Sequence, residues 1–370
     1  MDNKQEPPKL ILDLLSQRLP DFHLQGKPQP LSGGLLNYVW RVTGDASSSP
    51  PSMIIKWSPP YIASMPEVEL DPRRSSIEAK ALTVFELGET LAGVGDASAR
   101  APFLYTYDDD QHFLAMEDLG AWPSLGDWLR SDSITRREAE AIGVNLGQFM
   151  GKLHRSSAHR PNLAQHFNNS AIQRTRLEFQ YKNIQQYAQK AGLPNADEIG
   201  RRALQYGEKL LNPGLTFIMG DLWPPSILVA GSGLRIIDWE LAHYGRPSQD
   251  IGHLAAHLWM HSHRAVEDRA ASVAMQVLDN LLGSYRATLG DDFESLFGKE
   301  GVRESSVHFG SELLTRTTGV FQRDYLYADL DHDDPVIQEA VNIAARHICK
   351  PEIIDTFDAL GWRTWMHTKI

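Results

Sequence analysis

The chain has 370 residues, with 36 Lys and Arg against 47 Asp and Glu, a formal net charge of −11, and a single cysteine. The length exceeds a usual single hydrophobic core and predicts two lobes, and the acidic balance argues against nucleic acid as a partner. Cys349 has no second cysteine for an internal disulfide, which fits a reducing compartment. The polar start MDNKQEPPKL and the lack of a long apolar run argue against a signal peptide and a membrane span. We therefore expect a cytoplasmic protein without a membrane partner, and the oligomeric state stays open.

The first 120 residues have the pattern of a small, β-rich lobe. Short runs rich in β-branched and aromatic residues predict strands, and the Ser/Pro-rich stretch 47–52 predicts a loop. The predicted strands cover residues 38–42, 53–57, 103–107 and 112–116. Apolar residues at helical spacing predict a helix over 75–87. The segment 117–120 would then join this lobe to the rest of the chain.

Residues 121–370 have a mainly helical pattern. Thr135 and Glu138 form a capping-box pattern before a long apolar stripe, and a second helix is expected over 250–263. Two short apolar runs, 226–230 and 234–237, flank a Gly-Ser-Gly turn and suit the strands of a hairpin.

That hairpin predicts a shared cleft for two acidic residues that flank it. Asp221 precedes the first strand and Asp238 follows the second, so the hairpin would bring both to one end. One carboxylate can then take a proton from an attacking hydroxyl, while others hold a divalent cation on a phosphate. This division of roles is what a phosphotransferase needs.

The order Asp221-Leu-x-x-x-Ser226-Ile-Leu-Val, followed by Ile237-Asp-x-Glu240, resembles the catalytic and metal-binding loops of the aminoglycoside phosphotransferase and choline kinase superfamily. Further segments are similar to the methylthioribose kinase-like branch, and most of all to its hydroxytryptamine kinases: 31–42, 54–57, 219–223, 237–241 and 244–245. The resemblance implies an α+β, protein-kinase-like bilobal fold. Residues 1–120 would form the nucleotide-binding lobe, and 121–370 the catalytic and acceptor-binding lobe. It also implies ATP and Mg²⁺ as cofactors and a small-molecule alcohol as acceptor.

By this resemblance Asp221 is the catalytic base and Asp238 binds Mg²⁺. Ser226 occupies the place where many relatives carry an amide for a second metal ion. Glu240 would compensate for the weaker hydroxyl ligand, since the methylthioribose kinase branch pairs a serine with an Asp-x-Glu motif. The alternatives are a turn residue for Asp221 and an exposed or helix-start acid for Glu240.

Lys56 matches the lysine that kinases hold over the α- and β-phosphates, and Glu78 would anchor it by an ion pair. The turn containing Gly33, Gly34 and Asn37 would cover the phosphates with its amides. The segment before the lobe boundary would contact adenine, and its residues are Met116, Glu117, Asp118 and Leu119. Each pattern alone also describes an ordinary strand, turn or strand end.

The acceptor residues are the least defined. Trp223, Trp239 and Tyr244 follow the catalytic loops and would wall an aromatic pocket, although they also suit simple packing. Arg316 aligns where methylthioribose kinases carry an arginine pair, of which only one member remains here. These features favour a hydroxylated aromatic amine, such as a hydroxytryptamine, over methylthioribose or another sugar or amino alcohol.

Two other functional classes stay open. The departures at Ser226 and Met219 suit a catalytically impaired pseudokinase. His253, His257 and His261 follow one helix face, as in a metal-dependent hydrolase, but no acidic or cysteine partner is near in sequence. Ordinary, partly exposed histidines on a helix, with a structural role, are the favoured interpretation. Asp250 is expected to brace the catalytic loop, without a direct chemical role.

Overall fold

The computed structural model describes residues 6–31, 36–131, 133–323 and 325–353. The chain divides into two compact units. Unit 1 consists of Met1–Gly93, Ala101–Trp122 and Ile237–Leu241, and unit 2 of Val94–Arg100, Pro123–Ile236 and Ala242–Ile370. The boundary predicted after Gly120 is two residues from the division at Trp122. The division also assigns residues 94–100 to unit 2 and residues 237–241 to unit 1, which a single boundary does not predict.

Unit 1 is built on a five-stranded antiparallel sheet. In spatial order its strands are β1 (Gln29–Pro30), β2 (Tyr38–Thr43), β3 (Ser52–Trp57), β8 (Phe113–Glu117) and β7 (Leu104–Asp108). The four strands predicted from the sequence are confirmed to within one residue. A separate hairpin joins β4 (Tyr61–Ile62) to β5 (Met65–Glu69).

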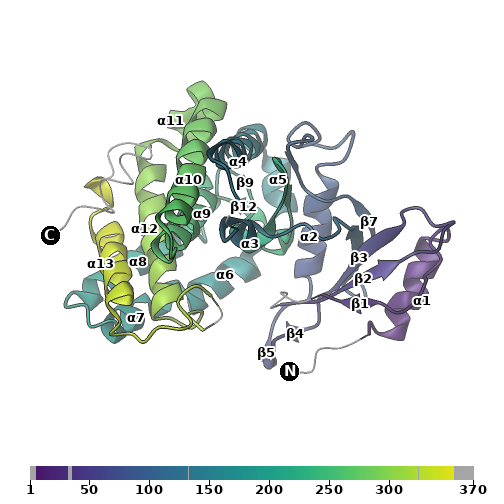
Figure 1. The fold of residues 1–370 in the computed structure, drawn as a ribbon, viewed down its shortest axis with the longest axis horizontal. Coiled ribbons are helices and arrows are strands. Elements are labelled where there is room, and N and C mark those ends of the chain that lie inside the picture. The colour runs from purple at the N-terminus through teal and green to yellow at the C-terminus, as the bar shows by residue number, and fades with distance from the viewer. Residues whose placement is uncertain (1–5, 32–35, 132, 324, 354–370) are drawn as a thin grey trace. The chain divides into compact units, whose positions relative to one another are not determined.

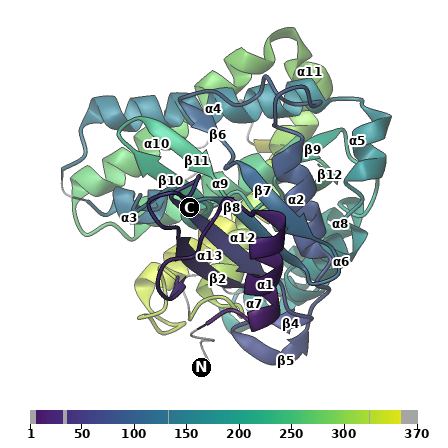
Figure 2. The same ribbon diagram turned by 90° about the vertical axis from the view of Figure 1, so that its right-hand side faces the viewer.

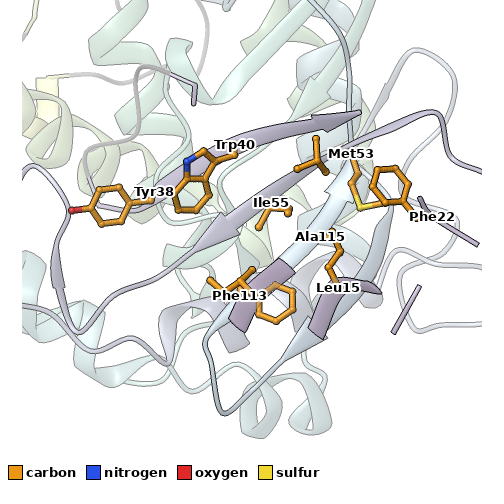
Figure 3. Close-up of a cluster of buried hydrophobic side chains, with 10 residues drawn as sticks. Leu15, Phe22, Tyr38, Trp40, Met53, Ile55, Phe113 and Ala115 are labelled. Carbon is orange, nitrogen blue, oxygen red and sulfur yellow. The ribbon is translucent and has the colours of Figure 1, made fainter. Parts of the chain in front are cut away.

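Helix α1 (Lys9–Arg18) covers one face of this sheet (Figure 2). Ile11 and Leu15 of the helix are buried together with sheet residues in one apolar cluster (Figure 3). The sheet residues of the cluster are Tyr38, Trp40, Val42, Met53, Ile55, Phe113 and Ala115. They occupy alternate positions along β2, β3 and β8, as the two-residue period of a strand requires.

The face of β3 opposite this apolar cluster carries Lys56. Because side chains alternate, Lys56 points away from the cluster that contains Ile55. It meets α2 (Arg74–Thr83), which also contacts the short 3₁₀ helix η3 (Trp239–Leu241). The helix predicted over 75–87 ends at Thr83, four residues before its predicted end.

Unit 2 is mostly helical (Figure 1). Its α-helices are α3 (Leu125–Leu129), α4 (Arg136–Ser157), α5 (Pro161–His166), α6 (Ser170–Phe179), α7 (Ile184–Lys190), α8 (Ala196–Lys209), α9 (Pro247–His263), α10 (Asp268–Leu289), α11 (Phe293–Leu296), α12 (Gly298–Thr317) and α13 (Pro335–Cys349). Its 3₁₀ helices are η1 (Tyr181–Asn183), η2 (Pro224–Ser226), η4 (Gly290–Asp292) and η5 (Pro351–Ile353). The capping box of Thr135 and Glu138 begins α4 as predicted. Within the described residues, no helix is long and apolar enough to span a membrane.

Short strands hold the loops of unit 2. β9 (Thr216–Ile218) pairs with β12 (His243–Gly245), and β10 (Ile227–Ala230) forms a hairpin with β11 (Gly233–Ile236). β11 also pairs in parallel with β6 (Ala99–Arg100). The predicted hairpin is confirmed, with each strand one residue from its expected start.

Candidate functional site

In unit 1, a buried lysine lies among three carboxylates. Nζ of Lys56 is 2.8 Å from Oε2 of Glu78 on α2 and 2.8 Å from Oδ1 of Asp238. Oε1 of Glu240 lies 3.6 Å from the same nitrogen. The fold therefore brings together four of the residues singled out in the sequence, although Asp238 follows Lys56 by 182 positions.

The charges around Lys56 keep it protonated. Burial alone lowers the pKa of Lys56, but the carboxylates of Asp238, Glu240 and Glu78 outweigh burial and hold this pKa well above its ordinary value. Burial raises the pKa of Glu78 to about 7, although Lys56 opposes that shift. Only 2% of the lysine side chain is exposed, so it is a fixed cation.

Asp238 has a backbone conformation that few residues other than glycine adopt. Its φ is +64°, in the left-handed region that Asp tolerates better than most residues. Its side chain is 45% exposed, against 7% for Glu240 and 1% for Glu78. Strained backbone of this kind gathers at functional sites. Asp238 is the carboxylate of this group that is accessible to a metal ion.

Glu240 belongs to a buried polar network. Nδ2 of Asn37 donates to both of its carboxylate oxygens at 2.8 Å, and Nε of Arg74 lies 3.2 Å from Oε2. Oδ1 of Asn37 accepts hydrogen bonds from Oγ of Ser58 and Nε of Arg74. The Asn37 side chain is thus directed at Glu240, and both the nucleotide contact of Asn37 and the metal contact of Glu240 stay predictions.

Arg74 is a site residue that sequence reasoning missed. It is 3% exposed and donates to the carbonyls of Leu36, Pro59 and Asp71, besides its contact with Glu240. Burial lowers the pKa of Arg74, although Glu240 opposes this. A cation at the first residue of a helix opposes the helix dipole. An arginine at this unfavourable position is the sequence signal that indicates a specific partner for Arg74.

The predicted adenine-binding segment lies at the end of β8. Met116 is buried, and Asp118 is engaged by Arg41, whose Nε and Nη2 donate to its two oxygens at 2.8 and 2.9 Å. Asp118 also accepts from the backbone N–H of Gly120. The Asp118 side chain therefore fixes the turn, and adenine binding by the backbone of 116–119 stays a prediction. Two predicted phosphate-binding residues lie outside the described residues: Gly33 and Gly34.

In unit 2, Asp221 lies on a loop that Asp250 holds in place. Asp250, on α9, accepts hydrogen bonds from the backbone N–H of Met219 at 2.9 Å and of Gly220 at 2.8 Å. Gly220 has a φ of +83°, a conformation that suits glycine. Asp250 is fully buried and braces the loop, as predicted.

Two side chains face the Asp221 carboxylate. Nη2 of Arg176 on α6 donates to Oδ1 at 2.9 Å, and Nε2 of His253 on α9 is 3.4 Å from the same oxygen. Burial raises the pKa of the Asp221 carboxyl group, although Arg176 opposes the shift. A carboxylate with a raised pKa is a stronger base, which suits the role predicted for Asp221.

Ser226 uses its hydroxyl within the same loop. Oγ donates to the carbonyl of Trp223 at 2.8 Å and accepts from the Trp223 N–H at 3.2 Å, and the carbonyl of Asp221 is 3.3 Å away. The residue is fully buried. These contacts describe a loop brace, and the metal contact of Ser226 stays a prediction.

Two of the predicted acceptor residues come together in unit 2. The guanidinium carbon of Arg316 is 4.8 Å from the ring centre of Trp223, 5.3 Å from that of Phe321 and 5.4 Å from that of Tyr325. Nε of Arg316 donates to Glu312 at 2.7 Å. The cluster therefore combines aromatic surface with a paired charge.

The other two predicted acceptor residues have the contacts of packing residues. Trp239 is fully buried in unit 1, with its ring edge-on to Phe85 at 5.0 Å. The hydroxyl of Tyr244 in unit 2 donates to the carbonyl of Leu215 at 2.7 Å and accepts from the N–H of Arg160 at 2.9 Å. The packing alternative suits the fully buried Trp239, and the acceptor contacts of both residues stay predictions.

The histidines of α9 meet an acidic partner that the sequence could not reveal. His253 and His257 lie 3.7 and 3.2 Å from oxygens of Glu312, which is 55 residues away from His257. One donor atom from each of the three lies within 4.8 Å of the others, close enough for a shared metal ion. However, Arg316 and Gln180 also donate to this carboxylate. The neighbouring cation opposes binding of a divalent ion.

Comparison with known proteins places the chain among phosphotransferases. Residues 27–287 match the sequence profile of the phosphotransferase enzyme family. The chain is 29% identical over 237 residues to a 4-hydroxytryptamine kinase of Psilocybe cyanescens, covering 60% of this chain and 64% of that one. It is 24% identical over 334 residues to a methylthioribose kinase of Geobacillus sp. (strain WCH70), covering 81% and 79%. A solved choline kinase structure from Cryptosporidium parvum superposes with a TM-score of 0.52 at 13% identity, covering 97% of this chain and 99% of that one.

These matches differ in what they establish. The chain spans slightly less than two thirds of the length of the hydroxytryptamine kinases it matches. The superposition with choline kinase shows the fold alone. The protein-kinase-like fold predicted from the sequence is thereby confirmed, with strands gathered in unit 1 and helices dominating unit 2.

Proposed function

Because the chain belongs to the phosphotransferase enzyme family, we propose that it is a kinase that transfers a phosphoryl group from ATP to the hydroxyl of a small molecule, with Mg²⁺ as cofactor. The observation that carries this proposal is the position of Lys56, whose buried Nζ is 2.8 Å from both Glu78 and Asp238. A fixed, permanently charged cation suits the binding of nucleotide phosphates.

The donor set of unit 1 fits a magnesium ion. Mg²⁺ prefers hard oxygen ligands, and Asp238 offers an exposed carboxylate beside two buried ones. Asp238 would hold the ion. When bound, the ion would neutralise charge on the β- and γ-phosphates.

Asp221 would act as the base. Its carboxylate would accept the proton of the acceptor hydroxyl as the oxygen bonds to the γ-phosphorus and the bond to the β-phosphate oxygen breaks. Arg176 would keep Oδ1 in place through its hydrogen bond. Burial supports this role because it raises the pKa of Asp221.

The acceptor class we propose is a hydroxylated aromatic amine. Trp223 and Tyr325 supply aromatic surface beside Arg316, and Glu312 supplies a carboxylate. Similarity to a hydroxytryptamine kinase supports the same class. The second candidate is a sugar such as methylthioribose, which is favoured by the guanidinium of Arg316 as a donor to hydroxyl groups and by the methylthioribose kinase similarity.

A competition assay tests this proposal. The protein is incubated with ATP, Mg²⁺ and equal concentrations of a hydroxytryptamine, methylthioribose and an aminoglycoside, and products are identified by mass. We expect the aromatic amine to be phosphorylated fastest, and Asp221→Asn to lower the rate by roughly a hundredfold or more while ATP still binds. Preference for methylthioribose would support the second candidate. ATP binding without transfer to any acceptor would support a pseudokinase.

A further inference from the structure

A buried chain of close polar contacts in unit 2 leads to Asp221. The hydroxyl of Tyr181 is 2.5 Å from Nδ1 of His308, and Nε2 of His308 is 3.1 Å from Nδ1 of His253. Nε2 of His253 lies 3.4 Å from Oδ1 of Asp221. Tyr181, His308 and His253 come from η1, α12 and α9, and none is more than 2% exposed.

The protonation states of these groups determine which atom donates and which accepts at each contact. Burial lowers the pKa of His253 far below its ordinary value and that of His308 to about 3, so both rings are neutral near pH 7. Burial raises the pKa of Tyr181, which keeps its proton. Because an ionised Asp221 can only accept, the His253 nitrogen that faces it carries hydrogen. Nδ1 of His253 then accepts from His308, and Nδ1 of His308 accepts from Tyr181.

Two carboxylates lie near His253, and Asp221 is the closer one. Glu312 is the other carboxylate near His253, and its Oε2 is 3.7 Å from Nδ1, farther than Asp221 is from Nε2. Both oxygens of Glu312 accept other hydrogen bonds, from Gln180 and from Arg316, and Oδ1 of Asp221 accepts one from Arg176. The shorter distance to Asp221 favours hydrogen on Nε2 of His253.

The Nε2–H of His253, at the end of this series of polar contacts, makes no hydrogen bond with the described residues. Among the described residues, Nε2 of His253 has no partner in hydrogen-bond geometry, although it is buried and only 3.4 Å from Asp221. Burying a donor without a partner is costly, so such a group needs an explanation.

We propose that the hydroxyl of the acceptor substrate completes this chain. Its oxygen would accept from Nε2–H of His253 while its hydrogen is donated to Asp221. His253 is then an acceptor-contacting residue, and Tyr181 and His308 are positioning residues that hold its ring in place. This inference rests on the proposed function, because it takes an alcohol as the acceptor.

The tautomers can be measured without any enzymatic reaction. Nuclear magnetic resonance of the full chain with ¹⁵N-labelled histidine identifies the protonated nitrogen of each ring near pH 7. We expect Nε2–H for His253 and His308 in the native protein, and the same tautomers in Tyr181→Phe, where Nδ1 of His253 still accepts from His308. An Nδ1–H tautomer of His253 in the native protein would overturn the inference, whatever the protein phosphorylates.

Kinetics test the contact with the acceptor. His253→Leu should lower kcat/KM for the acceptor by roughly ten- to a hundredfold and leave the KM for ATP within about twofold. His253→Gln keeps an N–H near the position of Nε2 and should recover part of the loss. Unchanged acceptor kcat/KM in His253→Leu would contradict the contact.

A neighbouring tyrosine provides the matched control. Tyr206 packs against the same His308 ring, with a centroid distance of 6.1 Å, but is not part of the hydrogen-bonded chain. Tyr181→Phe should lower acceptor kcat/KM by several-fold, whereas Tyr206→Phe should not. Equal losses in both variants would overturn the positioning role. A native protein that phosphorylates no alcohol would refute the proposed function and the acceptor contact together, while the tautomers would still be as measured.

Discussion

Asp238 and Glu240 carry the same charge two positions apart, yet their surroundings differ. Asp238 is 45% exposed and contacts Lys56, whereas Glu240 is buried between Asn37 and Arg74. An exposed carboxylate can change partners at little cost, but a buried one that compensates a buried guanidinium cannot. The two residues should therefore respond differently to loss of charge.

We predict that Asp238→Asn raises the Mg²⁺ concentration needed for half-maximal rate several-fold while leaving the free energy of unfolding nearly unchanged. Glu240→Gln should instead lower the free energy of unfolding by about 3–5 kcal/mol, because Arg74 loses its buried partner. Rate measurements at varied Mg²⁺ and urea unfolding of both variants check this pair. A stable Glu240→Gln protein with an altered Mg²⁺ requirement would identify Glu240 as a metal ligand instead.

Residue patterns indicate site residues that lie within a short, recognisable segment of the sequence. They do not indicate residues whose partners are far away in the sequence. Lys56 follows two isoleucines on a strand, and Asp221 precedes a hairpin, so both stand out in one short window. Glu312 carries no such mark, because its partner His257 is 55 residues away. Trp239 and Tyr244 follow the catalytic loops closely in sequence, but proximity in sequence does not determine where a side chain points.

Among the elements, helices α4 and α10 approach unusually closely. Gly143, Gly147 and Gly151 are spaced by four residues and so share one face of α4. A Cβ added at Gly147 would lie 2.4 Å from the carbonyl oxygen of Leu281 on α10, and one at Gly143 would lie 2.5 Å from that of Val277. The glycines allow the two backbones to come together, which explains their presence inside a helix despite their low helix propensity.

Gly147→Ala should lower the free energy of unfolding by roughly 1–3 kcal/mol, because the rigid α10 backbone leaves no room for the methyl group. Gly283→Ala is the control. Gly283 is an exposed residue of α10 with nothing within 4 Å of an added Cβ, so alanine there should raise stability by about 0.5–1 kcal/mol. Urea unfolding measures both. Equal effects of the two substitutions would mean that helix propensity, not close packing, governs Gly147.

Some helices and strands can be predicted from their own residues, and others cannot. β2 and β3 have enough β-branched and aromatic residues to be recognised alone, and α4 has its own capping box. β6 and β1 have two residues each and exist only because a partner strand pairs with them. Such strands carry no periodic pattern of their own, so they cannot be predicted from residue patterns.

In the whole molecule, unit 2 has an unusually polar interior. α9 is buried from Pro247 to His261, and its histidines meet Glu312, His308 and Tyr325. Burial keeps the imidazoles neutral because it penalises the charged form, although Glu312 opposes this lowering of the pKa for His253 and His257. Among the described residues, five histidines are buried and have lowered pKa values: His253, His257, His261, His308 and His347.

These histidines predict loss of stability in mild acid. In the folded protein the pKa of His257 is about 4 and that of His308 about 3, whereas an unfolded histidine titrates near 6.5. The unfolded chain therefore binds protons first as the pH falls below 6.5, and each such histidine costs up to about 1.4 kcal/mol of stability per pH unit until its folded pKa is reached. Glu78, whose pKa is raised to about 7, and Asp221, whose pKa is also raised by burial, act in the opposite direction, with one proton each.

The measurement is urea unfolding at several pH values between 7.5 and 5. We expect a steep decrease of the free energy of unfolding below pH 6.5. His347→Leu, which removes one buried histidine that contacts Ser306, should reduce the slope by up to about 1.4 kcal/mol per pH unit. Replacement of the exposed His23 by Gln should leave the slope as it is in the native protein. A free energy of unfolding that stays constant from pH 7 to 5 would show that these histidines are hydrated or protonated in the folded state, and would remove the basis for a neutral His253 beside Asp221.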